Sequence, residues 1–351
     1  MSSKWLIYGA NGFTGKLVAR EAAKRGLQPV LSGRSESAVA PMAAELGLDY
    51  CVFDLSDEAA VKRNISGKKL VLHCAGPFSK TSAPMVDACL AEGVHYLDIT
   101  GEIAVFEAVH QKHAEARRAD AVLLPGAGFD VVPTDCLAAK LVEALPAATS
   151  LKLAFEAGGG PSPGTARTSV ERLGQGGCIR RDGQLTSVPM AWKTRTIPFA
   201  HAEREAVTIP WGDVYTAFVS TGIGDVEVYL ALPPSAIRNM QRLRMLQPLL
   251  RLGVVKALLR KQIERKVSGP SGERRAKTAC QVWGEVKSAD GRSVSATMTT
   301  PNGYDLTVSA SLGLVEYLLE NEVEGGYYTP SLLMGSAYAE SLEGVSFTLR
   351  R

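Results

Sequence analysis

Residues 4–20 read KWLIYGANGFTGKLVAR, and this stretch predicts the fold of the first part of the chain. A short apolar run meets Gly9, Gly12 and Gly15 at every third position, and helical spacing of apolar residues follows. The pattern indicates a strand, a tight turn and a helix. Glycines let the backbone turn sharply near a ligand, and the helix N-terminus offers unpaired N–H groups and a positive dipole end. A dinucleotide pyrophosphate fits these properties.

The spacing of the three glycines is G-x-x-G-x-x-G, whereas the usual dinucleotide-binding pattern is G-x-G-x-x-G. One interpretation is therefore a tight turn with no ligand. The position of the turn, directly after a strand and at the start of a helix, favours the nucleotide interpretation. We predict a cofactor-binding turn formed by these residues: Gly9, Asn11, Gly12, Phe13, Thr14 and Gly15.

A second strand is predicted at residues 29–32, and Gly33, Arg34 and Ser35 follow it. In this fold the tip of the second strand lies beside the adenosine ribose, about 20 residues after the glycines. An acidic residue there would bind the ribose hydroxyls of NAD, whereas a guanidinium with the hydroxyls of Ser32 and Ser35 suits a 2′-phosphate. The alternative for Arg34 is a solvated surface residue. The sequence predicts NADP as the cofactor, with NAD as the alternative.

The composition is that of an ordinary globular protein, with 46% hydrophobic and 21% charged residues among 351, enough for two domains. The net charge of +3 is small, and no aromatic-basic pattern predicts a nucleic-acid partner. The N-terminus leads directly into the first strand without a signal peptide, so we predict a cytoplasmic protein. The six cysteines form no C-x-x-C pattern, which predicts reduced thiols and no metal site; for Cys74 a reactive role is the alternative to packing.

Strand and helix patterns alternate through the first third of the chain. Further strands are predicted at residues 49–53, 69–74, 95–99 and 121–125, with helical stretches between them. Such alternation predicts right-handed crossovers and a parallel, doubly wound α/β sheet. Ligands bind at the carboxyl ends of the strands of such sheets.

Polar and glycine-bearing turns follow those strand ends. Asp54 follows the third strand, where its carboxylate would meet the adenine amino group or cap the next helix. Near the nicotinamide we expect the turns after the fourth and fifth strands, with these residues: Ala75, Gly76, Pro77, Phe78, Thr100 and Gly101. Asp98 and Asp130 also lie at strand ends, and helix capping is the alternative role for Thr100 and Asp130.

Four blocks carry a family resemblance: YGANGFTG at 8–15, CAGPF at 74–78, YLDITGE at 96–102 and GFDVVPTD at 128–135. In order and spacing they resemble the saccharopine dehydrogenase-like oxidoreductases. The closest likeness is to the branch of the trans-acting enoyl reductases and the animal saccharopine dehydrogenase-like oxidoreductase. Shorter blocks extend the similarity over nearly the whole chain, at 164–169, 181–183, 220–223, 301–304 and 328–331. The GFDVVP sequence differs from that of lysine-pathway saccharopine reductases, which argues against saccharopine as the substrate.

The resemblance implies an NAD(P)-binding Rossmann domain with an inserted second α/β domain, and it makes a homodimer an expectation. We place the Rossmann domain at 1–135, a substrate and dimerisation domain at 136–327, and a C-terminal segment that returns to the Rossmann domain at 328–351. In the second domain, strands are predicted at 150–156, 178–188, 226–232, 278–287 and 293–300, and helices at 165–173 and 305–319. A mixed sheet covered on one face by helices fits this pattern.

Residues 236–266 contain nine lysines and arginines against one acid, Glu264, and an apolar stripe at helical spacing. Arg251 and Lys256 interrupt the segment, and Pro248 with Gly253 breaks its regularity, so it does not span a membrane. Three interpretations stay open. They are a helix packed on its own domain, a lid or dimer contact over an apolar substrate site, and a surface that contacts anionic lipid.

Together these features predict an NAD(P)H-dependent oxidoreductase that reduces a C=C or C=N bond of a small or lipid-like substrate. The cofactor would carry the hydride chemistry, and the protein would position the acceptor and exclude water. The candidate catalytic residues are Asp130, as proton donor, and Asp98, with water-mediated protonation as the rival. An amino-acid dehydrogenase acting on a secondary amine and a catalytically silent nucleotide- or lipid-binding protein are the alternatives.

Overall fold

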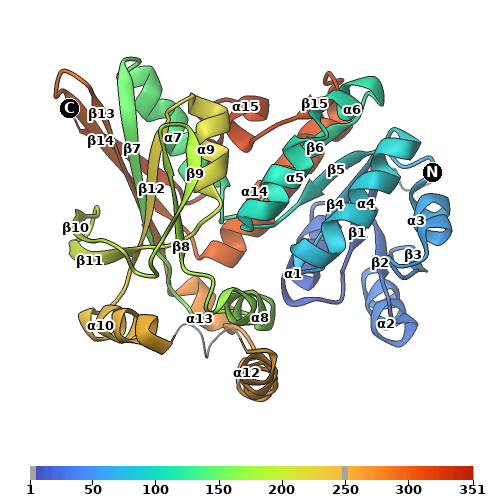
Figure 1. Ribbon diagram of the computed structural model, residues 1–351. Coiled ribbons are helices and arrows are strands. Elements are labelled where there is room, and N and C mark those ends of the chain that lie inside the picture. Colours follow the sequence, from blue (N-terminus) through green and yellow to red (C-terminus); the bar gives the residue numbers. More distant parts are fainter. Residues whose placement is uncertain (1–4, 247–251, 351) are drawn as a thin grey trace. The chain divides into compact units, whose positions relative to one another are not determined.

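The computed structural model describes residues 5–246 and 252–350. Pro248 and Arg251 of the predicted basic segment lie outside the described residues. The chain divides into two compact units (Figure 1). Unit 1 comprises Met1–Phe129 and Tyr304–Leu333, and unit 2 comprises Asp130–Gly303 and Met334–Arg351.

Unit 1 is built on a parallel sheet in the order β15-β6-β5-β4-β1-β2-β3. Its strands are β1 (Trp5–Tyr8), β2 (Val30–Gly33), β3 (Tyr50–Val52), β4 (Leu70–His73), β5 (His95–Asp98), β6 (Val122–Leu124) and β15 (Gly326–Tyr327). The residues of β1 are all buried, as is typical of a central strand of a parallel sheet, and the strand pairs with β2 and β4. This order places the turns after β1, β2 and β4 side by side at one edge of the sheet.

The helices of unit 1 follow its strands. They are α1 (Phe13–Lys24), α2 (Glu36–Leu46), α3 (Glu58–Ile65), α4 (Phe78–Glu92), α5 (Ile103–His110), α6 (His113–Arg118), α14 (Gly303–Glu320) and α15 (Pro330–Met334). The alternation confirms the predicted doubly wound Rossmann-type architecture. Within the described residues no helix is both long enough and apolar enough to cross a lipid bilayer.

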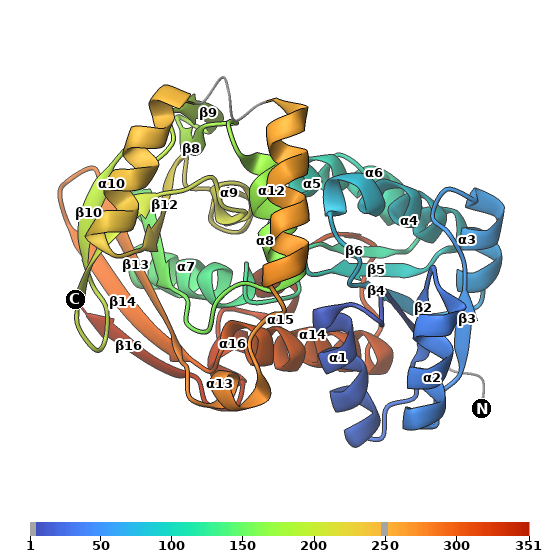
Figure 2. The same cartoon turned by 90° about the horizontal axis from the view of Figure 1, so that it is seen from below.

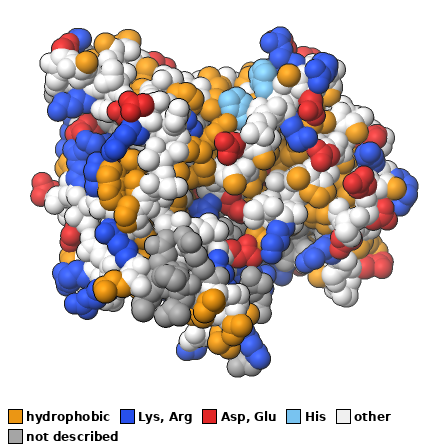
Figure 3. All heavy atoms as spheres, viewed as in Figure 1, with side chains coloured by type: hydrophobic (Ala, Val, Ile, Leu, Met, Phe, Trp, Pro, Cys, Tyr) orange, Lys and Arg blue, Asp and Glu red, His pale blue; other side chains and the backbone are white. Residues whose placement is uncertain are grey.

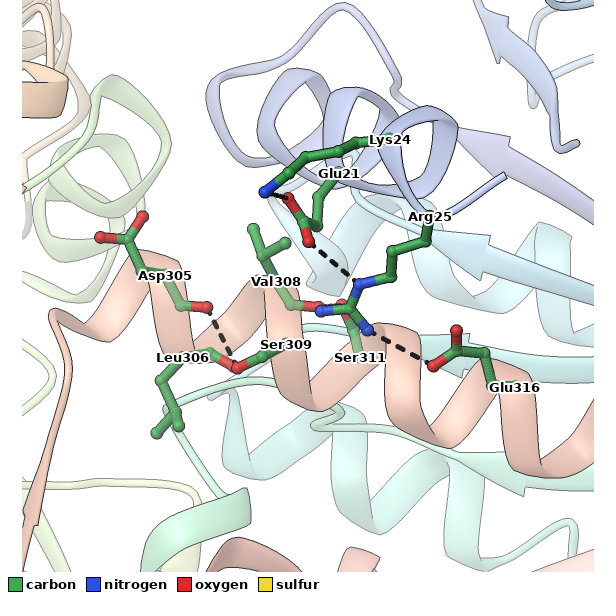
Figure 4. A network of polar contacts seen from close by, with 9 residues as sticks. All are labelled: Glu21, Lys24, Arg25, Asp305, Leu306, Val308, Ser309, Ser311 and Glu316. Atoms are coloured by element: carbon green, nitrogen blue, oxygen red, sulfur yellow. Dashed lines mark hydrogen bonds and ion pairs between the residues drawn. The ribbon is translucent and has the colours of Figure 1, made fainter. Parts of the chain in front are cut away.

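Helix α14 belongs to unit 1, although the predicted domain bounds assigned it to the second domain. The guanidinium of Arg25 joins α1 to α14, because its Nε lies 3.0 Å from Glu21 Oε1 and its Nη1 lies 3.4 Å from Glu316 Oε2 (Figure 4). Lys69 Nζ also donates to the carbonyl oxygen of Leu319 (3.2 Å). These contacts between distant parts of the chain are invisible to periodicity, which explains the different boundary.

Unit 2 is built on a mixed sheet in the order β10-β11-β12-β7-β13-β14-β16, to which the β8–β9 hairpin is attached through β12. Its strands are β7 (Ala148–Glu156), β8 (Gly177–Arg181), β9 (Gln184–Val188), β10 (Thr194–Pro198), β11 (Glu203–Thr208), β12 (Asp225–Ala231), β13 (Cys280–Ser288), β14 (Ser293–Thr300) and β16 (Ser346–Arg350). Only β7 and β12 pair in parallel, and the other pairs are antiparallel. The predicted mixed α/β domain is confirmed.

Helix α7 (Val132–Ala144) packs on β13, and Gly284 permits the close approach. A Cβ atom at Gly284 would lie 2.7 Å from Leu141 Cδ1 of α7, closer than carbon atoms can approach. The other helical segments of unit 2 are α8 (Pro163–Arg172), α9 (Asp213–Thr221), α10 (Pro234–Leu243), η1 (Arg244–Leu246), α12 (Gly253–Lys266), α13 (Gly272–Ala276) and α16 (Tyr338–Ser341). Figure 2 shows α10 and α12 on the same side of this unit.

The end of the chain takes a different course from the predicted segment 328–351. The strand that returns to the parallel sheet is the short β15, where the backbone N–H of Tyr327 donates to Nδ1 of His113 (3.1 Å). The last strand, β16, instead pairs with β14 in unit 2, with Thr348 opposite Thr297. A strand of two residues is too short to show an alternation of apolar and polar residues, so no pattern in the sequence predicts β15.

Candidate functional site

The turn between β1 and α1 is closed by its own backbone. The N–H groups of Gly9 and Ala10 donate to the carbonyl oxygen of Ser32 (2.8 and 3.0 Å), and that of Gly12 donates to the carbonyl of Gly9 (2.9 Å). Gly9 has φ of +81°, which L-residues rarely adopt. A Cβ at Gly15 would lie 2.2 Å from the carbonyl oxygen of Gly9. Glycine is therefore required at both positions for the helix to begin this close to the strand.

The first turn of α1 is open. Its N-cap is Gly12, which has no side chain to accept a hydrogen bond from the first amides of the helix. The amides of Phe13, Thr14 and Gly15 lie at the positive end of the helix, where an anion is stabilised. Asn11 lies over the end of β2, since a Cβ on Gly33 would be 2.8 Å from its Oδ1 atom. The turn thus fits a diphosphate bridge between β1 and β2.

The tips of β2 and β3 bring Arg34 and Asp54 close enough to interact electrostatically. Asp54 Oδ1 accepts hydrogen bonds from the backbone N–H (2.9 Å) and hydroxyl (2.8 Å) of Ser56. These bonds, with a smaller contribution from Arg34, lower the pKa of Asp54, so this carboxylate is ionised at neutral pH. Arg34 is exposed, and the hydroxyls of Ser35 and Ser37 lie 3.0 Å apart next to it. The predicted ribose and adenine residues therefore lie at adjacent strand tips.

The turn after β4, residues 74–78, is fixed by Thr81 of α4. The Thr81 hydroxyl donates to the carbonyl oxygen of Ala75 (2.7 Å) and lies 3.0 Å from Nε2 of His73. Burial lowers the pKa of His73 to about 3, so its ring is neutral. Burial also raises the pKa of Cys74 to about 12, which keeps it a thiol and disfavours the reactive role.

Glu102 is a site residue that sequence reasoning missed. Its Oε1 accepts from the backbone N–H of Phe78 (2.9 Å) and its Oε2 from that of Ser79 (3.3 Å). The carboxylate thus caps α4 from a distant loop. A signal in the sequence was a glutamate directly after Thr100 and Gly101, but spacing alone does not connect it to a helix 24 residues earlier.

Asp98 is buried and holds together the turns after β5 and β6. Its Oδ1 accepts from the backbone N–H groups of Thr100 and Gly126 (both 2.9 Å), and its Oδ2 accepts from the Tyr96 hydroxyl (2.7 Å). Burial raises the pKa of Asp98 to about 6 against the opposing effect of these hydrogen bonds. Thr100, also buried, accepts from the N–H of Glu102 (3.1 Å). Asp98 therefore supports the loop that carries Glu102.

Part of the chain is similar in sequence to known NADP-binding domains. Residues 5–124, which run from β1 to the end of β6, match the family described as the saccharopine dehydrogenase NADP-binding domain. The matched residues make up most of unit 1, and the match agrees with the family resemblance and the NADP-type cofactor predicted from the sequence.

Curated relatives match part of the chain. The mouse saccharopine dehydrogenase-like oxidoreductase is 31% identical over an alignment of 152 residues, and the match covers 37% of this chain and 35% of that protein. The trans-acting enoyl reductase of Mycobacterium leprae is 31% identical over an alignment of 138 residues, and the match covers 37% of this chain and 33% of that protein. The aligned region thus spans about a third of each relative's length. Both names agree with the prediction of an oxidoreductase.

A solved structure matches along the whole chain. Apo saccharopine dehydrogenase (L-Glu forming) from Saccharomyces cerevisiae has a TM-score of 0.68 and covers 99% of both chains at 12% identity. At this identity the match supports the fold alone. Both units, and not only the NADP-binding domain, therefore follow the fold of that enzyme.

Asp130, the predicted proton donor, begins unit 2 and thus lies outside the NADP-binding domain. Its backbone carbonyl accepts a hydrogen bond from Trp211 Nε1 (2.9 Å). Burial raises the pKa of the Asp130 carboxyl to about 6, and the charge of Arg172 opposes this shift. Asp213 lies in the same acidic cluster, with Oδ1 2.6 Å from the Thr134 hydroxyl, and burial raises its pKa well above the usual value.

The structure therefore groups the predicted residues by unit. The pyrophosphate, ribose and nicotinamide candidates, together with Asp98, all lie at the carboxyl edge of the parallel sheet of unit 1. Asp130 belongs with the acids of unit 2. In the described residues no group of three or more His, Cys, Asp or Glu side chains is arranged to hold a metal ion.

Proposed function

We propose that this chain is an NADPH-dependent oxidoreductase that reduces a C=C or C=N bond of a small or lipid-like substrate. The observation that carries the proposal is the open first turn of α1, whose amides face an anion site that only glycines at positions 9 and 15 permit. The bound cofactor supplies a hydride. The chain supplies a binding surface at the ends of β1, β2 and β4.

The residues divide the binding task between them. The amides of Phe13, Thr14 and Gly15 bind the pyrophosphate, and the exposed guanidinium of Arg34 binds the 2′-phosphate. The Asp54 carboxylate accepts a hydrogen bond from the adenine amino group, since its lowered pKa keeps it ionised. The loop of Gly76, Pro77 and Phe78, together with that of Thr100 and Gly101, borders the nicotinamide ribose. Each loop is held by a fixed residue: Thr81 for the first and Asp98 for the second.

We assign the two acids different roles. Both oxygens of Asp98 accept hydrogen bonds from its own unit, and the residue is fully buried, so it acts as a positioning residue. Asp130 keeps part of its surface exposed, and its raised pKa of about 6 leaves a fraction of its carboxyl protonated near neutral pH. We therefore favour Asp130 as the proton donor, with a water molecule as the rival donor.

The test is a titration of the purified chain with NADPH and NADH, comparing the parent with Arg34→Ala. A charge-assisted contact to phosphate contributes about 1.5 to 3 kcal/mol, so the variant should bind NADPH about 10- to 100-fold more weakly and NADH unchanged. Arg118→Ala, which removes an exposed arginine of α6, is the matched control. A parent that binds NADH more tightly than NADPH would overturn the role of Arg34.

Substrate panels test the reaction itself. We expect NADPH oxidation with enoyl thioesters or cyclic imines, and an Asp130→Asn variant with a weakened rate and no pH dependence near 6. Amine-dependent reduction of NADP would support the amino-acid dehydrogenase instead. Cofactor binding with no turnover of any substrate would support the silent nucleotide-binding protein. The homodimer and the cytoplasmic location remain predictions, and ultracentrifugation of the purified chain tests the first.

A further inference from the structure

Exposed apolar side chains gather on one surface of unit 2. In the described residues seven large hydrophobic side chains are strongly exposed, and five of them lie on or between α10 and α12: Leu243, Met245, Leu252, Val254 and Leu258. Met245 is 88% and Val254 74% exposed. We call these five residues, with the basic residues beside them, the α10–α12 surface. Singly exposed apolar residues are ordinary, but a concentration of them indicates a partner.

Helix α12 is apolar on two opposite faces. One face packs on α8, where Lys256 Nζ donates to the carbonyl oxygen of Glu171 (2.6 Å) and Leu259 is half-buried. Val254, Leu258 and Lys261 recur at helical spacing on the opposite face, and all three are exposed. Contact with α8 therefore holds α12 in place, and its second apolar face is left to solvent within this unit.

The basic residues around the apolar ones are exposed as well. On α10, Ile237 is buried and Met240 is half-buried against the unit, while Arg238 and Arg242 are exposed. On α12, Lys261 and Lys266 are exposed. Figures 1 and 2 show both helices on the same side of unit 2, and Figure 3 shows hydrophobic and basic side chains together at the lower end of the molecule.

We propose that the α10–α12 surface binds the headgroup layer of a membrane that contains anionic phospholipids. The arginines and lysines would bind lipid phosphates, and Met245, Val254 and Leu258 would enter the boundary of the acyl chains. The charge complementarity selects an anionic partner. The exposed side chains between the cations are aliphatic and not aromatic, which favours acyl chains over the stacked bases of a nucleic acid.

The contact is peripheral and does not depend on the reductase activity. Helix α12 has 14 residues, about 21 Å at 1.5 Å per residue, which is shorter than the hydrocarbon core of a bilayer. On the membrane, α12 would lie in the plane of the lipid headgroups, as basic amphipathic segments do. None of the predicted cofactor residues lies on α10 or α12, so the two proposals can fail separately.

The experiment is co-sedimentation of the full chain with vesicles of phosphatidylcholine alone or mixed with phosphatidylglycerol. We expect the chain to pellet with the mixed vesicles at low salt and to be released at high salt. Leu258→Glu should weaken binding at least about tenfold, because it loses the burial of a leucine and adds a repelled charge. Arg238→Ala should weaken it about fivefold.

The matched control is Leu332→Glu, which makes the same change at an exposed leucine of α15 in unit 1 and should bind vesicles as the parent does. Circular dichroism and NADPH titration check that each variant is folded. The proposal is overturned if the parent fails to pellet at low salt, or if Leu332→Glu loses binding as strongly as Leu258→Glu. An affinity for duplex DNA equal to that for the mixed vesicles would also overturn it. So would a parent chain that does not bind vesicles but forms a dimer that Leu258→Glu dissociates.

Discussion

Two helices of unit 1 begin at the carboxyl edge of the same sheet, yet their N-termini differ. Helix α1 follows β1 and has Gly12 as an N-cap that offers no side-chain acceptor. Helix α4 follows the adjacent strand β4, and the carboxylate of Glu102 accepts from its first amides, those of Phe78 and Ser79. Both N-termini attract an anion. The N-terminus of α4 binds a carboxylate of the chain itself, whereas that of α1 remains available for a ligand.

This difference in capping directs a dinucleotide to the N-terminus of α1 and away from that of α4. An open α4 N-terminus would compete for the pyrophosphate or bind free phosphate from solution. Glu102 removes that competitor, and Asp98 supports the loop that carries it through the backbone of Thr100. Substitutions at Gly15, Asp98 and Glu102 change the α1 N-terminus, the support of the Glu102 loop and the α4 N-terminus in turn.

The largest effect is expected from closing the α1 site with Gly15→Ala. The added Cβ would lie 2.2 Å from the Gly9 carbonyl, a backbone atom that cannot move without opening the turn. We expect NADPH affinity to fall about 100-fold, because relief of such a clash costs a few kcal/mol and displaces the amides. Gly12→Ala, whose Cβ would lie 3.2 Å from the same oxygen, is the graded comparison and should lose less. Equal affinity of Gly15→Ala and the parent, by fluorescence titration, would contradict the assignment of the turn.

The next effect concerns stability and is expected at Asp98. Its pKa of about 6 lies above the unfolded value of 3.8, so the folded state retains this proton longer and loses stability as the pH rises from about 4 to 6. The shift corresponds to about 3 kcal/mol over that window. Asp98→Asn keeps the acceptor for Thr100 and Gly126 but has no proton to lose, so its unfolding free energy should lack this decline.

Urea unfolding of both proteins between pH 4 and 7 measures the difference. Asp49→Asn, at an exposed aspartate, is the control and should follow the parent. Parallel curves for the parent and Asp98→Asn would show that the pKa of Asp98 is the same in the folded and unfolded states, which would contradict the prediction. Asp98→Ala, which leaves two buried N–H groups without an acceptor, should destabilise the chain at every pH.

The open N-terminus of α1 could be predicted from the sequence, whereas the capping of α4 by Glu102 could not. Gly15 is required by its contact with Gly9, six residues earlier, and Gly9 by its own positive φ, so the role of both can be read in a short stretch of sequence. Arg34 and Asp54 follow strands whose apolar pattern is readable, and parallel pairing brings such strand ends together. The fold class followed from the same alternation of strands and helices.

The missed features depend on contacts between distant residues. Glu102 reaches back 24 positions to cap α4, and no local pattern marks that pairing. Helix α14 was predicted as a helix, but its unit is decided by partners such as Arg25, 291 residues away. Propensity describes which element forms, whereas side-chain contacts such as these decide where it packs.

The smallest effect, and the sharpest test of the comparison, comes from opening α4. Glu102→Ala removes the carboxylate from the amides of Phe78 and Ser79 and should cost about 1 to 2 kcal/mol of stability, whereas Glu102→Gln retains an acceptor and should cost less. The emptied N-terminus should then bind sulfate. Sulfate stabilises folded proteins in general and also fits the open α1 turn. Because both effects act equally on the parent, they cancel when the variant is compared with it. A larger rise in melting temperature with sulfate for Glu102→Ala than for the parent therefore reports α4 alone, and equal rises would mean that Glu102 does not occupy an anion site.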